Sequence, residues 1–198
     1  MTYDGLIVGL GNPGAKYART RHNFGFMLAD RLVAHWSGQP GASCSSRNAR
    51  GNAEAWDVSE DYGARRWLVV KPLTFMNLSG QVVGDVCRKN GIAPDRVLVA
   101  HDELDLPLGT LRFKFSGGLA GHNGLKSVAA HLGTRDFARL RMGIGRSENG
   151  EAMAEYVLRS FLPAEWDQVA QVLDLGLDAV LHYCREGLVA ATARLHAR

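Results

Sequence analysis

The sequence has few of the features that mark a secreted, membrane-bound or metal-stabilised protein. Its three cysteines, Cys44, Cys87 and Cys184, lie far apart and form no C-x-x-C pair, which argues against a disulfide framework and a structural zinc site. No apolar run approaches the roughly 18 residues of a membrane span. The N-terminus has no basic segment, and its apolar run is too short for a signal peptide. We therefore expect a cytoplasmic protein without membrane association and with reduced thiols.

The chain also lacks a strong charge of either sign. It has 23 lysines and arginines against 20 acidic residues, so its formal net charge is +3. This mild excess permits a polyanionic partner such as nucleic acid but does not require one. A length of 198 residues with 46% hydrophobic residues is enough to bury the core of one domain. We predict a single domain over residues 1–198, with the polar, glycine-rich segment 37–52 as a surface loop.

Short apolar runs alternate with segments of helical periodicity along the chain. Strands are expected at residues 5–10, 53–58, 66–71, 96–101, 109–115 and 137–145. Helices are expected at residues 22–36, 79–90 and 122–132, and from Pro163 to near the end. Gly91 is expected to cap the second of these helices, and Asn123 can cap the third. The alternation predicts an α/β fold with a mixed, mostly parallel sheet flanked by helices.

Gly9, Gly11 and Gly14 spell G-x-G-x-x-G directly after the first expected strand, a pattern typical of dinucleotide binding. In that fingerprint a helix begins at once, and its N-terminus binds the pyrophosphate. Here Asn12 and Pro13 impose a turn, and mostly polar residues separate it from the first helix. The context disfavours a dinucleotide, and we expect no cofactor.

No G-x-S-x-G motif is present, and no cysteine neighbours a basic group in a glycine-rich turn. A hydrolase with this sequence would therefore use water activated by a side-chain base, and histidine suits that role because its ordinary pKa of ~6.5 lies near working pH. Of the seven histidines, His22 and His122 precede asparagines in polar loops at expected helix starts. The helix dipole disfavours a cation there, which would help to keep a neutral base. A structural role for either histidine is the alternative.

The segment HDELD at residues 101–105 could be a metal-binding cluster. It lacks the H-E-x-x-H spacing, and alternate side chains at a strand end point apart. Asp102 alone, orienting a histidine from another loop, fits this position better, so we expect no metal. The amides of Asn12, Asn77 and Asn123 also stand in loops beside apolar runs, where a rigid scaffold presents groups that bind substrate.

Arg112 and Lys114 are two residues apart in an expected edge strand, so both side chains point to the same face. Such a pair can bind phosphate groups. The alternative is a solvated strand face without a ligand, and the residues alone leave both interpretations open.

Four ordered blocks resemble the bacterial peptidyl-tRNA hydrolase family. The blocks are VGLGNPGAKYARTRHNFGF, KPLTFMNLSG, AHDELDLPLGTLRFKFSGGLAGHNGLKS and RLRMGIGR, and the similarity runs from about residue 5 to about residue 190. The resemblance implies cleavage of the ester between the C-terminus of a peptide and the 3′ ribose of tRNA. It also implies a monomeric α/β fold that needs neither a metal nor an obligate protein partner.

The resemblance further implies roles for particular residues. It makes His22 the base and Asp102 its orienting partner. It implies that Asn12, Asn77 and Asn123 bind the peptide and the water. It also implies that Tyr17 and Met76 line the site near the tRNA 3′ end. We also place His122 among the substrate-binding residues. Contacts to phosphates of the tRNA acceptor end are assigned to Arg112, Lys114 and Arg141.

Two positions depart from the family pattern. Leu119 and Ala120 stand where members often have histidine and glycine, which could alter the loop over the tRNA end, and Arg112 stands where the family usually has lysine. A non-catalytic RNA-binding protein on the same fold is the alternative function. The set of His22, Asp102 and three asparagines argues against it, because a pure binder has no chemical need for all five.

Overall fold

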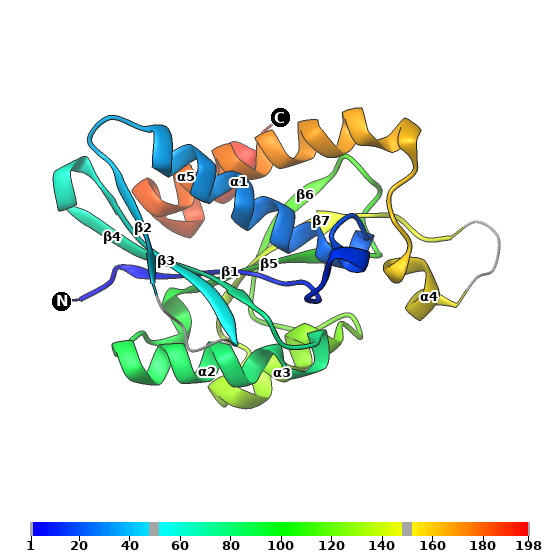
Figure 1. The fold of residues 1–198 in the computed structure, drawn as a ribbon, viewed down its shortest axis with the longest axis horizontal. Helices are drawn as coiled ribbons and strands as arrows, with labels where there is room; N and C mark the ends of the chain where they lie inside the picture. Colours follow the sequence, from blue (N-terminus) through cyan, green and yellow to red (C-terminus); the bar gives the residue numbers. More distant parts are fainter. Residues whose placement is uncertain (1, 48–51, 148–151, 198) are drawn as a thin grey trace.

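A mixed sheet forms the centre of the molecule in the computed structural model, which describes residues 2–47, 52–147 and 152–197. Within these ranges the sheet has seven strands in the order β2-β3-β4-β1-β5-β7-β6, and helices cover both of its faces (Figure 1). The predicted α/β class is confirmed. The strands are β1 Gly5–Gly9, β2 Ser43–Arg47, β3 Ala53–Glu60, β4 Arg65–Pro72, β5 Val97–Glu103, β6 Leu111–Phe115 and β7 Ala138–Gly143.

The centre of the sheet is parallel, and both of its edges are antiparallel. Strand β1 pairs in parallel with β4 and β5, and β5 pairs in parallel with β7. Antiparallel pairing joins β3 to β2 and β4, and β6 to β7. The central strands are therefore buried on both faces, which explains why their sequences are continuous apolar runs.

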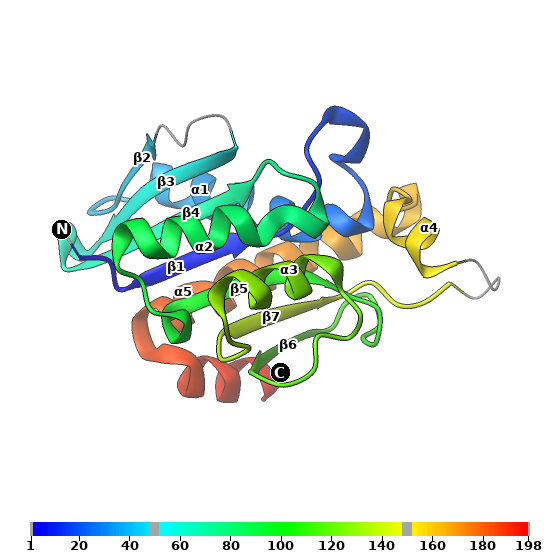
Figure 2. The same cartoon turned by 90° about the horizontal axis from the view of Figure 1, so that it is seen from below.

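Two helix layers sandwich the sheet. Figures 1 and 2 show α1 and α5 on one face and α2 and α3 on the other. The α-helices are α1 Phe24–Gly38, α2 Ser79–Asn90, α3 Asn123–Leu132, α4 Met153–Leu158 and α5 Trp166–His196, and three short 3-10 turns matter for the site: η1 Ala15–Tyr17, η2 Arg21–Asn23 and η4 Met76–Leu78. None of the helices in the described ranges is apolar over a length that would cross a bilayer.

The core consists of two apolar layers, one on each side of the sheet, and β1 contributes to both. Ile7 packs in the layer under α1 and α5, whereas Leu6 and Val8 pack in the layer under α2 and α3. This alternation is the two-residue period of a strand. Burial on both sides makes β1 and its neighbours a rigid base for the loops that follow them.

Two local expectations need correction, and one helix was not expected. Residues 43–47 of the expected loop form the edge strand β2, while residues 48–51 lie outside the described residues. This strand is mostly exposed and pairs with β3, and no apolar alternation marks it in the sequence. Helix α4 has no counterpart among the expected helices.

The cap of α3 is His122 and not Asn123, because the His122 ring accepts a hydrogen bond from the Leu125 amide. Gly91 caps α2 in the left-handed conformation, as predicted.

The start of α1 lies unusually close to the sheet. A Cβ atom added to Gly25 would lie 2.3 Å from the carbonyl oxygen of Ala100, and one added to Gly9 would lie 2.3 Å from the carbonyl oxygen of Gly25. Only glycine permits this backbone contact. The close approach brings η2, the turn that precedes α1, to the carboxyl end of β5.

Candidate active site

The site lies where the parallel strands β1, β4 and β5 end, the edge at which open α/β sheets bind ligands. Asn12 follows β1, Met76 follows β4 in the turn η4, and Asp102 is the penultimate residue of β5. His22 reaches the same edge from η2. The structure thus brings together side chains that are up to 90 positions apart in the sequence.

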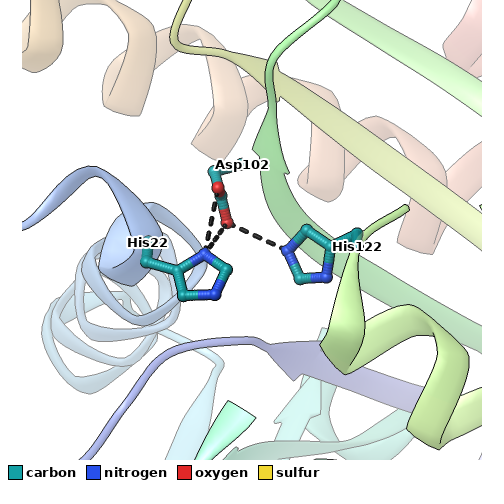
Figure 3. Close-up of side chains that lie close together, drawn as sticks. All are labelled: His22, Asp102 and His122. Atoms are coloured by element: carbon teal, nitrogen blue, oxygen red, sulfur yellow. Dashed lines mark hydrogen bonds and ion pairs between the residues drawn. The ribbon is translucent and has the colours of Figure 1, made fainter. Parts of the chain in front are cut away.

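A buried carboxylate joins two histidines at this edge (Figure 3). Nδ1 of His22 lies 3.0 Å from Oδ1 and 3.1 Å from Oδ2 of Asp102. Nε2 of His122 lies 3.0 Å from Oδ1 of the same carboxylate. The side chain of Asp102 is 2% exposed, so its charge is held by these two rings and not by water. The contact between Asp102 and His22 confirms that the two residues lie together, whereas the sequence gives no sign of the second contact, from His122.

The backbone of α3 determines which nitrogen of His122 carries the proton. The amide of Leu125 donates to Nδ1 of His122 over 3.3 Å. Nδ1 is therefore the acceptor in neutral His122, and Nε2–H donates to Asp102. Because Asp102 also accepts from Nδ1–H of His22, the Nε2 atom of neutral His22 keeps its lone pair. Figure 3 shows that this nitrogen points away from the carboxylate.

The charges of the site shift the pKa values of Asp102 and His22 in opposite directions. Burial alone would raise the pKa of Asp102, but His22 and His122 hold it well below its usual range. Burial alone would lower the pKa of His22, but the charge of Asp102 and its hydrogen bond raise it above the usual value. The pKa of His22 is therefore raised, which is opposite in direction to the effect expected from the helix start.

His101 supports this arrangement from behind. Its Nδ1 donates to the carbonyl oxygen of Asp102 over 2.8 Å, and its ring packs edge-on against His122 with centroids 5.0 Å apart. Burial, followed by the charge of His122, lowers the pKa of His101 to about 3. His101 is thus a neutral structural residue at working pH, in line with its position inside a strand.

Asn12 is fixed in place by Asn23, a residue that the sequence did not single out. The Asn12 amide donates to Oδ1 of Asn23 over 2.8 Å, and Nδ2 of Asn23 donates to the Asn12 carbonyl over 2.9 Å. Oδ1 of Asn12 accepts from the Met76 amide over 2.8 Å. The NH₂ group of Asn12 is then the end that can donate to a substrate. The signal for Asn23 was weak: it follows His22 directly, but no spacing rule links it to Asn12.

Met76 and His122 both pack closely against Gly124. A Cβ atom added to Gly124 would lie 2.5 Å from Sδ of Met76 and 3.1 Å from Cε1 of His122. A side chain at residue 124 would therefore displace both groups. Met76 is buried, so it forms part of the wall beside the histidine pair.

The other residues that we expect to bind substrate lie on η1, η4 and the start of α3. Tyr17 is half-buried in η1, where the Lys16 ammonium lies 4.8 Å from its ring centroid. Asn77 in η4 and Asn123 at the first position of α3 are exposed. Among the contacts of the described residues, none joins these three to the Asp102 carboxylate. Their role in binding substrate therefore stays a prediction.

The expected phosphate-binding residues lie on the last two strands of the sheet. Arg112 is exposed and Lys114 is half-buried, and both point to one face of β6 as predicted. Arg141 of β7 lies opposite Arg112 in the strand register. Its Nε donates to Oε2 of Glu103 over 2.8 Å, so Arg141 has less freedom than Arg112 to reach a ligand.

The three residues around the carboxylate are also a potential metal-binding group. One ligand atom each from His22, Asp102 and His122 lies within 4.8 Å of the others. The hydrogen bond from Leu125 argues against a metal here, because it leaves the proton of His122 on the nitrogen that would have to bind the ion. The absence of a metal from the reaction stays a prediction, and chelation can test it.

Known proteins match this chain over its full length. The sequence model of the family described as "Peptidyl-tRNA hydrolase" matches residues 6–198. A peptidyl-tRNA hydrolase of Oleidesulfovibrio alaskensis is 48% identical, with 100% of this chain and 98% of that protein covered. One from Nitratidesulfovibrio vulgaris is 45% identical at the same coverage. The crystal structure of peptidyl-tRNA hydrolase from Acinetobacter baumannii has a TM-score of 0.87 and 33% identity, with 100% and 97% covered. The resemblance inferred from the four sequence blocks is confirmed.

Proposed function

The chain belongs to the peptidyl-tRNA hydrolase family, whose members are ester hydrolases, and we propose that it hydrolyses peptidyl-tRNA with water activated by His22. The bond cleaved is the ester between the C-terminus of the peptide and the 3′ ribose of tRNA. The observation that carries the mechanism is the contact between His22 and Asp102, which leaves Nε2 of His22 as a base directed away from the carboxylate.

In the first step, Nε2 of neutral His22 takes a proton from water as the water attacks the ester carbonyl carbon. Asp102 holds the ring in the tautomer that has Nδ1–H, and its charge stabilises the imidazolium that forms. His122 donates to the same carboxylate and keeps it anionic and aligned. The imidazolium then returns the proton to the 3′ oxygen of the ribose as the ester bond breaks.

We assign stabilisation of the oxyanion to Asn12. Donors that are fixed before the reaction stabilise developing charge best, because they need no reorganisation. Asn12 is buried and held by Asn23 and Met76, with its NH₂ group left to donate. Asn77 and Asn123, which are exposed, are assigned to the peptide and the attacking water.

We assign the tRNA backbone to the basic residues of β6 and β7. Arg112 and Lys114 share one strand face, and Arg141 lies beside them. Such contacts supply affinity and orientation without reading sequence. Hydrolysis of peptidyl-tRNA recycles tRNA for translation, so we place the activity in the cytoplasm.

The direct test is incubation of the purified protein with an N-blocked aminoacyl-tRNA, followed by measurement of free tRNA. Hydrolysis should be catalytic and should be lost in His22→Ala. Tight binding without release of tRNA would contradict the proposal and would favour the RNA-binding alternative.

A further inference from the structure

The turn that carries His22 is attached to a distant part of the chain. Figure 1 shows η2 beside the connector between α4 and α5, residues 159–165, and the two segments pair through their backbones. The amide of Arg21 donates to the Arg159 carbonyl over 3.0 Å, and the Phe161 amide donates to the Arg19 carbonyl over 3.1 Å. Thr20 and Ser160 form a β-bridge between these two hydrogen bonds.

The side chain of Arg21 completes the attachment. Its Nη2 lies 2.9 Å and 2.8 Å from the two carboxylate oxygens of Glu165, just before α5, and its Nη1 donates to the Ser160 carbonyl over 2.7 Å. The guanidinium carbon also lies 4.6 Å and 5.1 Å from the ring centroids of Tyr156 and Phe161. The side chains of Arg21 and Glu165 are 6% and 22% exposed, so solvent screens this ion pair weakly.

Successive residues of the turn thus have separate tasks. Thr20 and Arg21 face the connector, His22 faces Asp102, and Asn23 faces Asn12. A shift of Arg21 would move the backbone on which His22 stands, and general-base catalysis requires a base placed to within a fraction of an ångström. Nothing in the chemistry of ester cleavage itself requires an arginine at this position.

We propose that Arg21 and Glu165 are positioning residues for His22, and that their buried ion pair holds the base in line with Asp102 from the far side of the turn. This inference rests on the proposed function of His22. Neither residue touches Asp102 or the reacting atoms, so the ion pair acts through the backbone of η2. The connector between α4 and α5 thereby helps to position the catalytic base.

Two conservative variants test the ion pair. Glu165→Gln keeps the shape of the side chain, but it removes the charge and replaces one accepting oxygen with an NH₂ donor. Arg21→Lys keeps the charge but loses the paired hydrogen bonds. We expect each to lower kcat about tenfold with little change in KM. The double variant should lose about as much as either single variant, because residues that act as one unit are not additive. Asp174→Asn is the matched control, since it breaks the exposed ion pair of α1 and α5 with Arg31.

Titration of the His22 ring by NMR provides a measurement that does not depend on activity. The titratable groups facing this ring are Asp102 of β5 and His122 before α3, with His101 behind His122. If the ion pair aligns His22 with Asp102, its loss should lower the pKa of His22, because that pKa is raised by Asp102. The acid limb of the pH–rate profile should move to lower pH by the same amount. Asp174→Asn should leave both curves unchanged.

The possible outcomes are distinct. Folded Glu165→Gln and Arg21→Lys proteins with wild-type kcat and an unshifted His22 titration would overturn the inference. A lower unfolding temperature without a change in titration would assign the pair a stabilising role only, which also overturns it. If the wild type released no tRNA, the proposed function would fail, while a shifted His22 titration in the variants would still show that the ion pair positions the ring.

Discussion

The carboxyl edge of the sheet and the edge strand β6 both carry charged side chains, but the two regions hold them differently. At the carboxyl edge Asp102 is buried between two histidines, and Asn12 has partners on both its side chain and its backbone. On β6, Arg112 is exposed and Lys114 is half-buried, so solvent reaches both side chains.

This difference suggests that the carboxyl edge positions the reacting groups, whereas β6 contributes affinity for the substrate. Groups fixed by mutual hydrogen bonds in a dry site can meet a reacting atom at a set distance, and small displacements are costly. Mobile cations near solvent attract phosphate over a range of positions, and salt screens the attraction. Changes at the carboxyl edge should therefore alter turnover, whereas changes on β6 should alter binding.

The largest effect is expected from His22→Ala. Loss of the general base should lower kcat by roughly a hundredfold or more while KM changes little. Circular dichroism should show an intact fold, because His22 is not part of either apolar core layer. Near-normal kcat in a folded variant would remove His22 from the mechanism.

A smaller loss, of roughly tenfold or more, is expected from Asp102→Asn, together with a changed pH profile. Asp102 raises the pKa of His22, so the wild-type rate should rise through a pKa above the usual value as the neutral base forms. Without the anion the pKa of His22 falls. The rise should therefore occur at lower pH, and the plateau should be lower. Identical profiles for the two proteins would make Asp102 a strand-end residue without a catalytic role.

On β6, replacing both Arg112 and Lys114 with alanine should mainly raise KM for full-length peptidyl-tRNA. The salt dependence of binding should become shallower by about 0.7 to 0.9 in log–log slope for each phosphate that the variant no longer binds. Turnover at saturation should change little, because the two side chains would bind the ground state and the transition state equally. A minimal substrate lacking most of the tRNA is the control and should be cleaved equally well. An unchanged salt slope would refute phosphate binding by this strand.

No effect is expected from exhaustive chelation. The proton on Nε2 of His122 opposes metal binding between the histidines, so activity should not depend on a bound ion. Activity abolished by chelator and restored by a divalent cation would show instead that His22, Asp102 and His122 hold a metal. The three side chains would then be metal ligands, and Asp102 would no longer be a carboxylate held only by hydrogen bonds from two histidines.

Local sequence patterns were sufficient for the elements that build the two core layers. The apolar run of β1 and the helical period of α2 with Gly91 were located to within a residue or two, because burial imposes these patterns directly. Strand β2 was missed because its mostly exposed side chains leave no pattern, and α4 was missed because it is short and largely exposed. The secondary structure of elements without a buried face depends on pairing with neighbouring segments, so local sequence does not predict it.

For the site, the sequence identified the candidate side chains and, through the family blocks, predicted that His22 and Asp102 form a pair, and the two are in contact. The contacts of His122 with the same carboxylate, of Asn23 with Asn12, and of Arg21 with Glu165, which is 144 positions away, appear only in the folded chain. Residue periodicity reports which face of an element is buried. It does not report which loops meet at the end of a sheet, because that depends on how closely helices such as α1 dock on the strands.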